Sequence, residues 1–168
     1  VDWNYTGPKE TAETFNKYEK NKDIIIFDAG CGTGLVGLEL KKYGFKNFHG
    51  ADLSQTLLDS VPNNLYQKLT KVDLNKTIEA EDNSYDAVMC VGTFTFGHVK
   101  PNALDEFVRI TKSGGLICFT INEGIHEEYG FDKKIISLNE NNKWKEIEFF
   151  KSDYIASKDV NAWLGLYR

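Results

Sequence analysis

The chain has 168 residues, of which 41% are hydrophobic, and this size and composition suit one domain with a core of its own. Twenty Lys and Arg against twenty-five Asp and Glu give a net charge of −5, and no basic block could follow a phosphate backbone, so a nucleic-acid partner is not expected. No apolar stretch reaches the roughly 18 residues of a membrane span, so a membrane partner is not expected either.

The N-terminal pattern predicts an irregular stretch, "DWNYTGP", followed by a helix over Thr11–Tyr18. Farther along, five apolar runs predict strands. Several of these runs are apolar on both faces, as parallel strands covered by helices are. The runs are Ile24–Asp28, Asn47–Asp52, Tyr66–Asp73, Tyr85–Gly92 and Gly115–Ile121.

Helical patterns lie between the predicted strands. Gly34–Tyr43 predicts a helix that ends at Gly44, a residue suited to the left-handed cap. Ser54 is suited to cap a short helix, and Pro101 precedes another apolar pattern of helical period. Strands that alternate with helices indicate a doubly wound parallel sheet.

The last third of the chain has a different pattern. A helix is expected at Phe131–Leu138, and Trp144–Phe150 and Ala162–Tyr167 predict an antiparallel pair at the sheet edge. The expected fold is therefore α/β: a Rossmann-like, doubly wound, seven-stranded sheet, mostly parallel, with an antiparallel strand near the C-terminal edge. Residues 1–168 are expected to form a single domain.

The three cysteines, Cys31, Cys90 and Cys118, lie far apart in apolar or glycine-rich surroundings. This pattern favours buried thiols over disulfides or zinc ligands, and it predicts a cytoplasmic protein with no metal site. The first residue is Val1 rather than methionine, so we expect further residues before it in the full-length protein. The oligomeric state is left open by the sequence.

The first strand-to-helix turn carries glycines at alternate positions, Gly30, Gly32 and Gly34, in the pattern D-x-G-x-G-x-G that starts at Asp28. Glycine permits positive φ and lets backbone amides approach a ligand closely. In a sheet of this kind, ligands bind outside the carboxyl ends of the strands, where this turn lies. A dinucleotide fingerprint would need glycine at Leu35, and no Gly-Lys-Ser/Thr follows, so neither NAD nor a P-loop ligand is favoured.

Acidic residues stand at the ends of three predicted strands. Asp28 suits a ligand with a cationic group such as an α-ammonium, whereas it would repel pyrophosphate. Asp52 is placed to accept hydrogen bonds from ribose hydroxyls, and Asp73 from an adenine amino group. The alternative is that they are solvated side chains beside an ordinary glycine turn.

This combination of glycine turn and carboxylates resembles the class I S-adenosylmethionine-dependent methyltransferases. A narrower similarity, carried by "GTGLVG" and "VGTFTFGHV", is to the small methyltransferase-like group related to the Williams-Beuren syndrome region protein, and it covers nearly the whole chain. Gln55 and Ser113 depart from that group's usual residues. The resemblance implies S-adenosyl-L-methionine as cofactor and S-adenosyl-L-homocysteine as product.

The resemblance also implies which residues contact the cofactor. Tyr5 is expected to close over the cofactor carboxylate, as part of an N-terminal segment, residues 1–22, that covers the site. The implied contacts are Asp28, Gly30, Gly32, Gly34, Asp52, Leu53, Asp73, Leu74, Val91, Gly92 and Tyr5.

Methyl transfer from a sulfonium is an in-line displacement, in which alignment alone can lower the barrier by about 7–11 kcal/mol, so a dedicated base is not required. His98 is a candidate catalytic base, and packing or capping is its alternative role. Phe94 and Phe96 either line an acceptor pocket or pack in the core.

The sequence therefore predicts a methyltransferase (EC 2.1.1.-) that acts on a small-molecule acceptor. The segment that follows the predicted strand Tyr85–Gly92 lacks the Asp/Asn-Pro-Pro-aromatic motif of many nucleic-acid amino-methyltransferases. A non-catalytic S-adenosylmethionine-binding module and an NAD-dependent oxidoreductase are the alternatives. The sequence does not identify the methyl acceptor.

Overall fold

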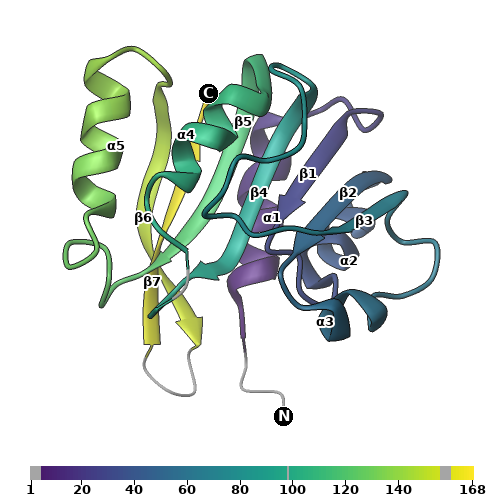
Figure 1. The fold of residues 1–168 in the computed structure, drawn as a ribbon. Coiled ribbons are helices and arrows are strands. Elements are labelled where there is room, and N and C mark those ends of the chain that lie inside the picture. Colours follow the sequence, from purple (N-terminus) through teal and green to yellow (C-terminus); the bar gives the residue numbers. More distant parts are fainter. Residues whose placement is uncertain (1–4, 98, 156–159) are drawn as a thin grey trace.

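The computed structural model describes residues 5–97, 99–155 and 160–168, without the side chains of 153–155. In this part of the chain, seven strands form one sheet in the order β3-β2-β1-β4-β5-β7-β6 (Figure 1). β1 to β5 run parallel, and β7 is antiparallel to both β5 and β6, which confirms the predicted fold class. The strands are β1 Ile25–Ala29, β2 Asn47–Asp52, β3 Lys68–Lys71, β4 Tyr85–Phe94, β5 Thr111–Asn122, β6 Glu146–Ile155 and β7 Val160–Tyr167.

Helices cover both faces of the sheet, each over its own apolar cluster (Figure 1). The cluster under α4 and α5 contains Phe107, Phe119 and Phe131, and the cluster under α1, α2 and α3 contains Phe15 and Leu40. This two-sided core is the reason that the central strands are apolar on both faces. The helices are α1 Gly7–Tyr18, α2 Leu35–Lys42, α3 Gln55–Asp59, α4 Ala103–Ile110 and α5 Phe131–Glu140.

Several predicted boundaries differ from the structure, and two of the differences have a clear local cause. α1 begins at Gly7, inside the stretch predicted to be irregular, because Pro8 fits the first turn of a helix, where no amide donor is needed. The predicted strand Tyr66–Asp73 is only β3, and all four of its residues are exposed, because β3 is the edge strand. Tyr66 is instead buried in the core cluster that contains α2.

Two other local predictions, on the ends of α2 and on the cysteines, are confirmed. α2 begins after Gly34, at φ 91°, and is followed by Gly44, at φ 97°. The three cysteines are buried and free. None of the helices in the described ranges combines the length and the apolar character that crossing a bilayer requires.

A substitution at Gly50, in the middle of β2, tests how closely the sheet packs beneath the first turn. A Cβ at this position would lie 2.8 Å from Leu69 Cδ2, 2.9 Å from Cys31 Sγ and 2.9 Å from Tyr66 Cδ1. We expect Gly50→Ala to lower the free energy of unfolding by about 1–3 kcal/mol, because overpacking forces these neighbours apart. Urea unfolding measures the change. Thr70→Ala, on the exposed neighbouring strand, is the control and should stay within about 0.5 kcal/mol of the wild type; an equal effect of the two changes would contradict the expectation.

Candidate functional site

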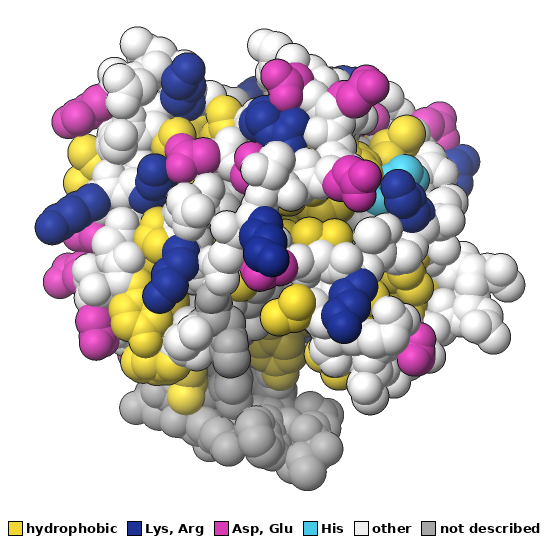
Figure 2. All heavy atoms as spheres, viewed as in Figure 1, with side chains coloured by type: hydrophobic (Ala, Val, Ile, Leu, Met, Phe, Trp, Pro, Cys, Tyr) yellow, Lys and Arg dark blue, Asp and Glu magenta, His cyan; other side chains and the backbone are white. Residues whose placement is uncertain are grey.

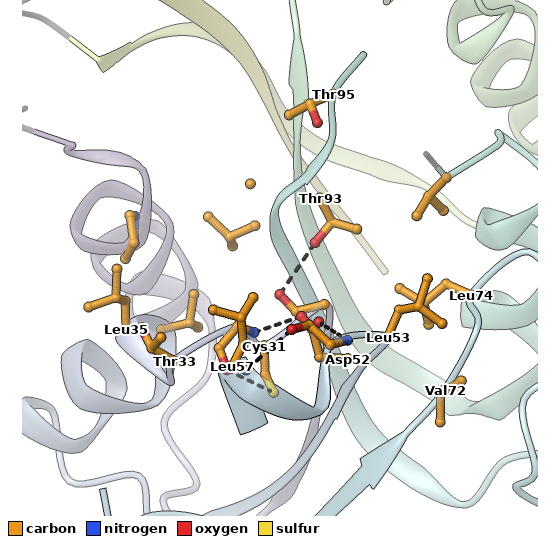
Figure 3. A pocket seen from close by; sticks show the side chains of 18 of the residues that line it. Cys31, Thr33, Leu35, Asp52, Leu53, Leu57, Val72, Leu74, Thr93 and Thr95 are labelled. Atoms are coloured by element: carbon orange, nitrogen blue, oxygen red, sulfur yellow. Dashed lines mark hydrogen bonds between the residues drawn. The ribbon is translucent and has the colours of Figure 1, made fainter. Parts of the chain in front are cut away.

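An open pocket of about 700 Å³ lies at the carboxyl ends of the parallel strands (Figure 3). It is bordered by the turns that follow β1, β2, β3 and β4, and by Tyr5 and Pro8 from the N-terminal segment. Such a volume suits one small ligand of the size of a nucleoside derivative. The position is the one that the sequence predicted for ligand binding.

The glycine turn after β1 forms one wall of this pocket. A Cβ at Gly30 would collide with Thr93 Oγ1, and the Thr93 hydroxyl donates a hydrogen bond to the Gly30 carbonyl oxygen at 3.4 Å (Figure 3). A Cβ at Gly32 would meet no atom within 4 Å, so this residue presents bare backbone to open space. Gly30 and Gly32 both have positive φ, at 69° and 55°, as predicted.

The Asp52 carboxylate connects the glycine turn to the end of β2. Its Oδ2 accepts a hydrogen bond from the Gly32 amide at 2.9 Å, and its Oδ1 accepts one from the Ser54 amide at 2.9 Å (Figure 3). Each carboxylate oxygen has a further lone pair. Asp52 is only partly buried and lines the pocket, so it can also accept hydrogen bonds from a ligand.

The structure brings together most of the residues predicted to contact the cofactor. Asp73 lines the pocket beyond Asp52, and its Oδ1 accepts a hydrogen bond from the Asn75 amide at 3.0 Å. His98, the predicted catalytic residue, lies outside the described residues. The predicted residues that line the pocket are Tyr5, Gly30, Gly32, Asp52, Leu53, Asp73, Leu74, Val91 and Gly92.

Asp28 and Gly34 do not line the pocket, in contrast to the other predicted residues. Gly34 faces Val61, Leu65 and Tyr66, on the side of the turn that packs into the core. The placement of Asp28 behind the turn is a tertiary effect: its side chain is held by a residue from a distant part of the chain. Direct contact of Asp28 and Gly34 with a cofactor stays a prediction.

The Asp28 side chain is 1% exposed, and its Oδ2 accepts a hydrogen bond from the Tyr66 hydroxyl at 2.5 Å. Its Oδ1 is buried and has no hydrogen-bond donor among the described residues. Burial raises the pKa of Asp28 to about 7; the Tyr66 hydrogen bond opposes this shift, and the neighbouring Asp52 charge adds to it. Asp28 is therefore only partly ionised near neutral pH.

Residues that the sequence analysis did not select also line the pocket, among them Thr93 and Thr95. Phe94 and Phe96 do not line it. Phe94 is buried against Phe131, with a centroid distance of 4.7 Å, and Phe96 is 57% exposed. The sequence contained a signal for this arrangement: in "TFTF" the period of two places the threonines on the opposite side of the extended chain from the phenylalanines.

The charged side chains among the described residues that line the pocket are all acidic. Asp52 and Asp73 line it, and no Lys or Arg is among the described lining residues. Elsewhere in the described ranges, no group of three or more His, Cys, Asp or Glu side chains is arranged to hold a metal ion. The pocket electrostatics therefore favour a cationic ligand over a pyrophosphate.

Comparison with known proteins places the chain in a family. The methyltransferase domain family matches residues 27–119, which is more than half of the chain and contains the glycine turn, Asp52 and Asp73. The chain belongs to the methyltransferase domain family. This confirms the predicted superfamily, while the narrower subgroup stays a prediction.

Three curated relatives resemble parts of this methyltransferase domain. Methyltransferase-like protein 27 from Homo sapiens is 40% identical over 98 residues, 57% of this chain and 40% of that protein. The ubiquinone biosynthesis O-methyltransferase of Rickettsia bellii is 33% identical over 109 residues, 62% of this chain and 45% of that protein. The ribosomal protein L11 methyltransferase of Ruminiclostridium cellulolyticum is 31% identical over 94 residues, 50% of this chain and 29% of that protein. The aligned residues thus span less than half the length of each of these relatives.

A solved structure shows the same fold across nearly the whole chain. It is a TehB-like SAM-dependent methyltransferase from Corynebacterium glutamicum, with a TM-score of 0.69 and 20% sequence identity. The match covers 94% of this chain and 85% of that one. The arrangement of strands and helices is therefore shared.

Gly30 tests the close contact between the glycine turn and β4. We expect Gly30→Ala to lower the free energy of unfolding by about 2–5 kcal/mol, because positive φ and collision with Thr93 both oppose the added methyl group. Gly32→Ala, which meets only the backbone strain, should cost about 1–2 kcal/mol. Adding Thr93→Ala to Gly30→Ala should recover part of the loss in chemical denaturation. No recovery would show that the side-chain collision is not the cause.

The raised pKa of Asp28 predicts a pH-dependent difference in stability between the wild type and a variant that cannot ionise at this position. The pKa of Asp28 rises from about 4 in the unfolded chain to about 7 in the folded protein, so the unfolded state releases the proton first and wild-type stability falls as the pH rises between these values. We expect Asp28→Asn, which cannot ionise, to be more stable than the wild type at pH about 8, with a difference that shrinks toward pH about 4. Urea unfolding midpoints across this range measure it; parallel pH profiles would contradict it.

Proposed function

We propose that this methyltransferase domain binds S-adenosylmethionine in the pocket at the carboxyl ends of the strands and transfers its methyl group to a small-molecule acceptor. The observation that carries the proposal is a bare glycine turn beside Asp52 and Asp73, with no cation among the described lining residues. A ligand with a sulfonium and an ammonium group gains from this arrangement, whereas a dinucleotide phosphate is repelled. The solved neighbour of the same fold is itself named as SAM-dependent.

The residues present fit the parts of this cofactor. The unpaired Asp28 Oδ1, buried behind the glycine turn, is suited to receive a donor from the ligand. We assign the ribose hydroxyls to Asp52, the adenine amino group to Asp73, and the faces of the adenine ring to the apolar Leu53, Leu74 and Val91. Tyr5 stands at the N-terminal side of the pocket, where it would cover the amino-acid portion.

When bound, the cofactor would supply a methyl group on a sulfonium, and S-adenosylhomocysteine would leave on the side of the methyl carbon opposite to, and in line with, the attacking acceptor atom. The chain's own contribution is to hold the acceptor in that line and to exclude water. Thr93, Thr95 and Gly97, at the exit of β4, border the pocket and are placed to contact the acceptor. His98, next to Gly97 in the sequence, is proposed as the base for acceptors that carry a proton.

A small-molecule acceptor is supported by the pocket size and by the name of the ubiquinone biosynthesis relative. The ribosomal protein L11 relative is named for a protein substrate, so a protein side chain is the competing acceptor. On the face shown in Figure 2, Lys and Arg side chains are interspersed with Asp and Glu, with no basic track for a nucleic acid.

Ligand-dependent unfolding tests the proposal. S-adenosylhomocysteine at about one hundred times its dissociation constant should raise the free energy of unfolding by about 2.7 kcal/mol, because it binds the folded state alone. NADH at the same concentration should give no shift. No stabilisation by saturating S-adenosylhomocysteine would overturn the proposal.

Transfer of a labelled methyl group to a panel of small phenols, amines, thiols and carboxylic acids then identifies the acceptor class. Transfer to ribosomal proteins in the same assay would instead identify a protein as the acceptor. Binding without transfer to either set would assign the domain as a binding module.

A further inference from the structure

Tyr66 lies behind the glycine wall of the pocket and does not line the pocket itself. It lies in the segment before β3, and its side chain is buried, with 8% exposed. Its ring packs beneath the glycine turn and the start of α2. A Cβ added at Gly34 would lie 3.3 Å from the nearest atom of the Tyr66 ring. At Gly37 this distance would be 2.8 Å, and at Gly50 it would be 2.9 Å.

Three glycines thus leave the space that one aromatic ring occupies. This close fit sets the position of the Tyr66 hydroxyl at the far end of the ring. The hydroxyl reaches Asp28 on β1, which is separated from β3 by β2, and donates a hydrogen bond to its Oδ2 at 2.5 Å. A hydrogen bond to a buried carboxylate is among the stronger kinds in proteins.

Among the described residues, no cation is found to compensate the charge of Asp28. The ionisable groups that affect it or are affected by it are Tyr66 from the segment before β3, Cys31 from the glycine turn, Asp52 from β2 and Cys90 from β4. Each of these is neutral or negative at neutral pH. Tyr66 is therefore the one group among them that stabilises the ionised form of Asp28 in the free protein.

The two oxygens of the Asp28 carboxylate differ. Oδ2 is held by Tyr66, and Oδ1 is buried with no donor in the described part of the chain. An unpaired buried acceptor is costly, so such an oxygen points to a donor that arrives with a ligand. Gly30 and Gly32, two and four residues farther along, line the pocket, so Asp28 stands directly behind its bare wall.

We propose that Tyr66 is a positioning residue for the cofactor. By holding Oδ2 of Asp28, its hydroxyl favours the ionised form of this carboxylate and leaves Oδ1 as the acceptor for the cofactor's α-ammonium group. The inference rests on the proposed function, because it names how one part of the same site recognises one part of the ligand.

Two ligands separate this role from simple packing. S-adenosylhomocysteine carries the α-ammonium group, whereas 5′-methylthioadenosine has the same nucleoside and no amino-acid portion. Titration calorimetry of each ligand into the wild type and into Tyr66→Phe, from pH about 6 to about 8.5, compares them across the ionisation of Asp28. Tyr85→Phe is the matched control, because the Tyr85 hydroxyl is 3.0 Å from His49 Nδ1 and Tyr85 does not line the pocket.

We expect Tyr66→Phe to weaken S-adenosylhomocysteine binding about tenfold at pH 7 and to change 5′-methylthioadenosine binding less than about twofold. The loss should shrink as the pH rises above 7, because a growing fraction of Asp28 ionises at higher pH even without the Tyr66 hydrogen bond. In the wild type, S-adenosylhomocysteine should bind more tightly as the pH rises from about 6 to about 8. Tyr85→Phe should bind both ligands as the wild type does.

Equal weakening of both ligands at every pH would make Tyr66 a packing residue and overturn the inference, as would no weakening at all. Wild-type protein that binds both ligands equally would also overturn it and leave the proposed function standing, whereas binding of neither ligand would end both. If Tyr66→Phe does not fold, Asp28→Asn replaces it and should show the same selective loss of S-adenosylhomocysteine, without the pH dependence.

Discussion

The carboxylate of Asp52 connects the two turns on which the pocket depends. It accepts one backbone amide from the glycine turn after β1 and one from the turn after β2, each at 2.9 Å. The parallel pairing of β1 with β2 makes this possible, because Ala29 lies opposite Ala51 and both strands end at the same edge. α2 starts directly after the first turn and α3 directly after the second, so one side chain helps to place two helices as well as the wall of the pocket.

The electrostatics of the free protein are unfavourable in one place. Asp28 is buried near Asp52, and burial together with this second charge raises the Asp28 pKa to about 7. Nothing among the described lining residues neutralises the pocket. Such an arrangement lowers the stability of the free protein and is relieved by a cationic ligand, which is a common relation between stability and function at binding sites.

The glycine turn is packed closely on its core side and is open on its pocket side. Gly30 lies against Thr93, and Gly34 and Gly37 leave room for Tyr66, so the turn is held closely on its core side. Gly32 faces open space on the other side. A turn that is fixed from behind and bare in front presents a preformed backbone surface to a ligand without the cost of ordering a loop.

Much of the site could be predicted from local sequence. β2 has the predicted bounds, and the glycines of the first turn have the expected positive φ. Asp52, Asp73 and the residues beside them line the pocket, because they lie at or just beyond the ends of strands and parallel strands end at one edge. The bounds of β3 were wrong because an apolar run does not distinguish a strand residue from Tyr66, which turns into the core.

The sequence by itself determined the alternation of strands and helices, the glycine turn and the acidic strand ends, since these depend on periodicity and on the backbone freedom of glycine. Only the tertiary structure decided that Asp28 stands behind the turn and bonds to Tyr66, 38 residues away. It also decided that Phe94 enters the core while Thr93 and Thr95 border the pocket. These outcomes depend on which distant side chains come into contact when the sheet assembles, and no local sequence pattern predicts such contacts.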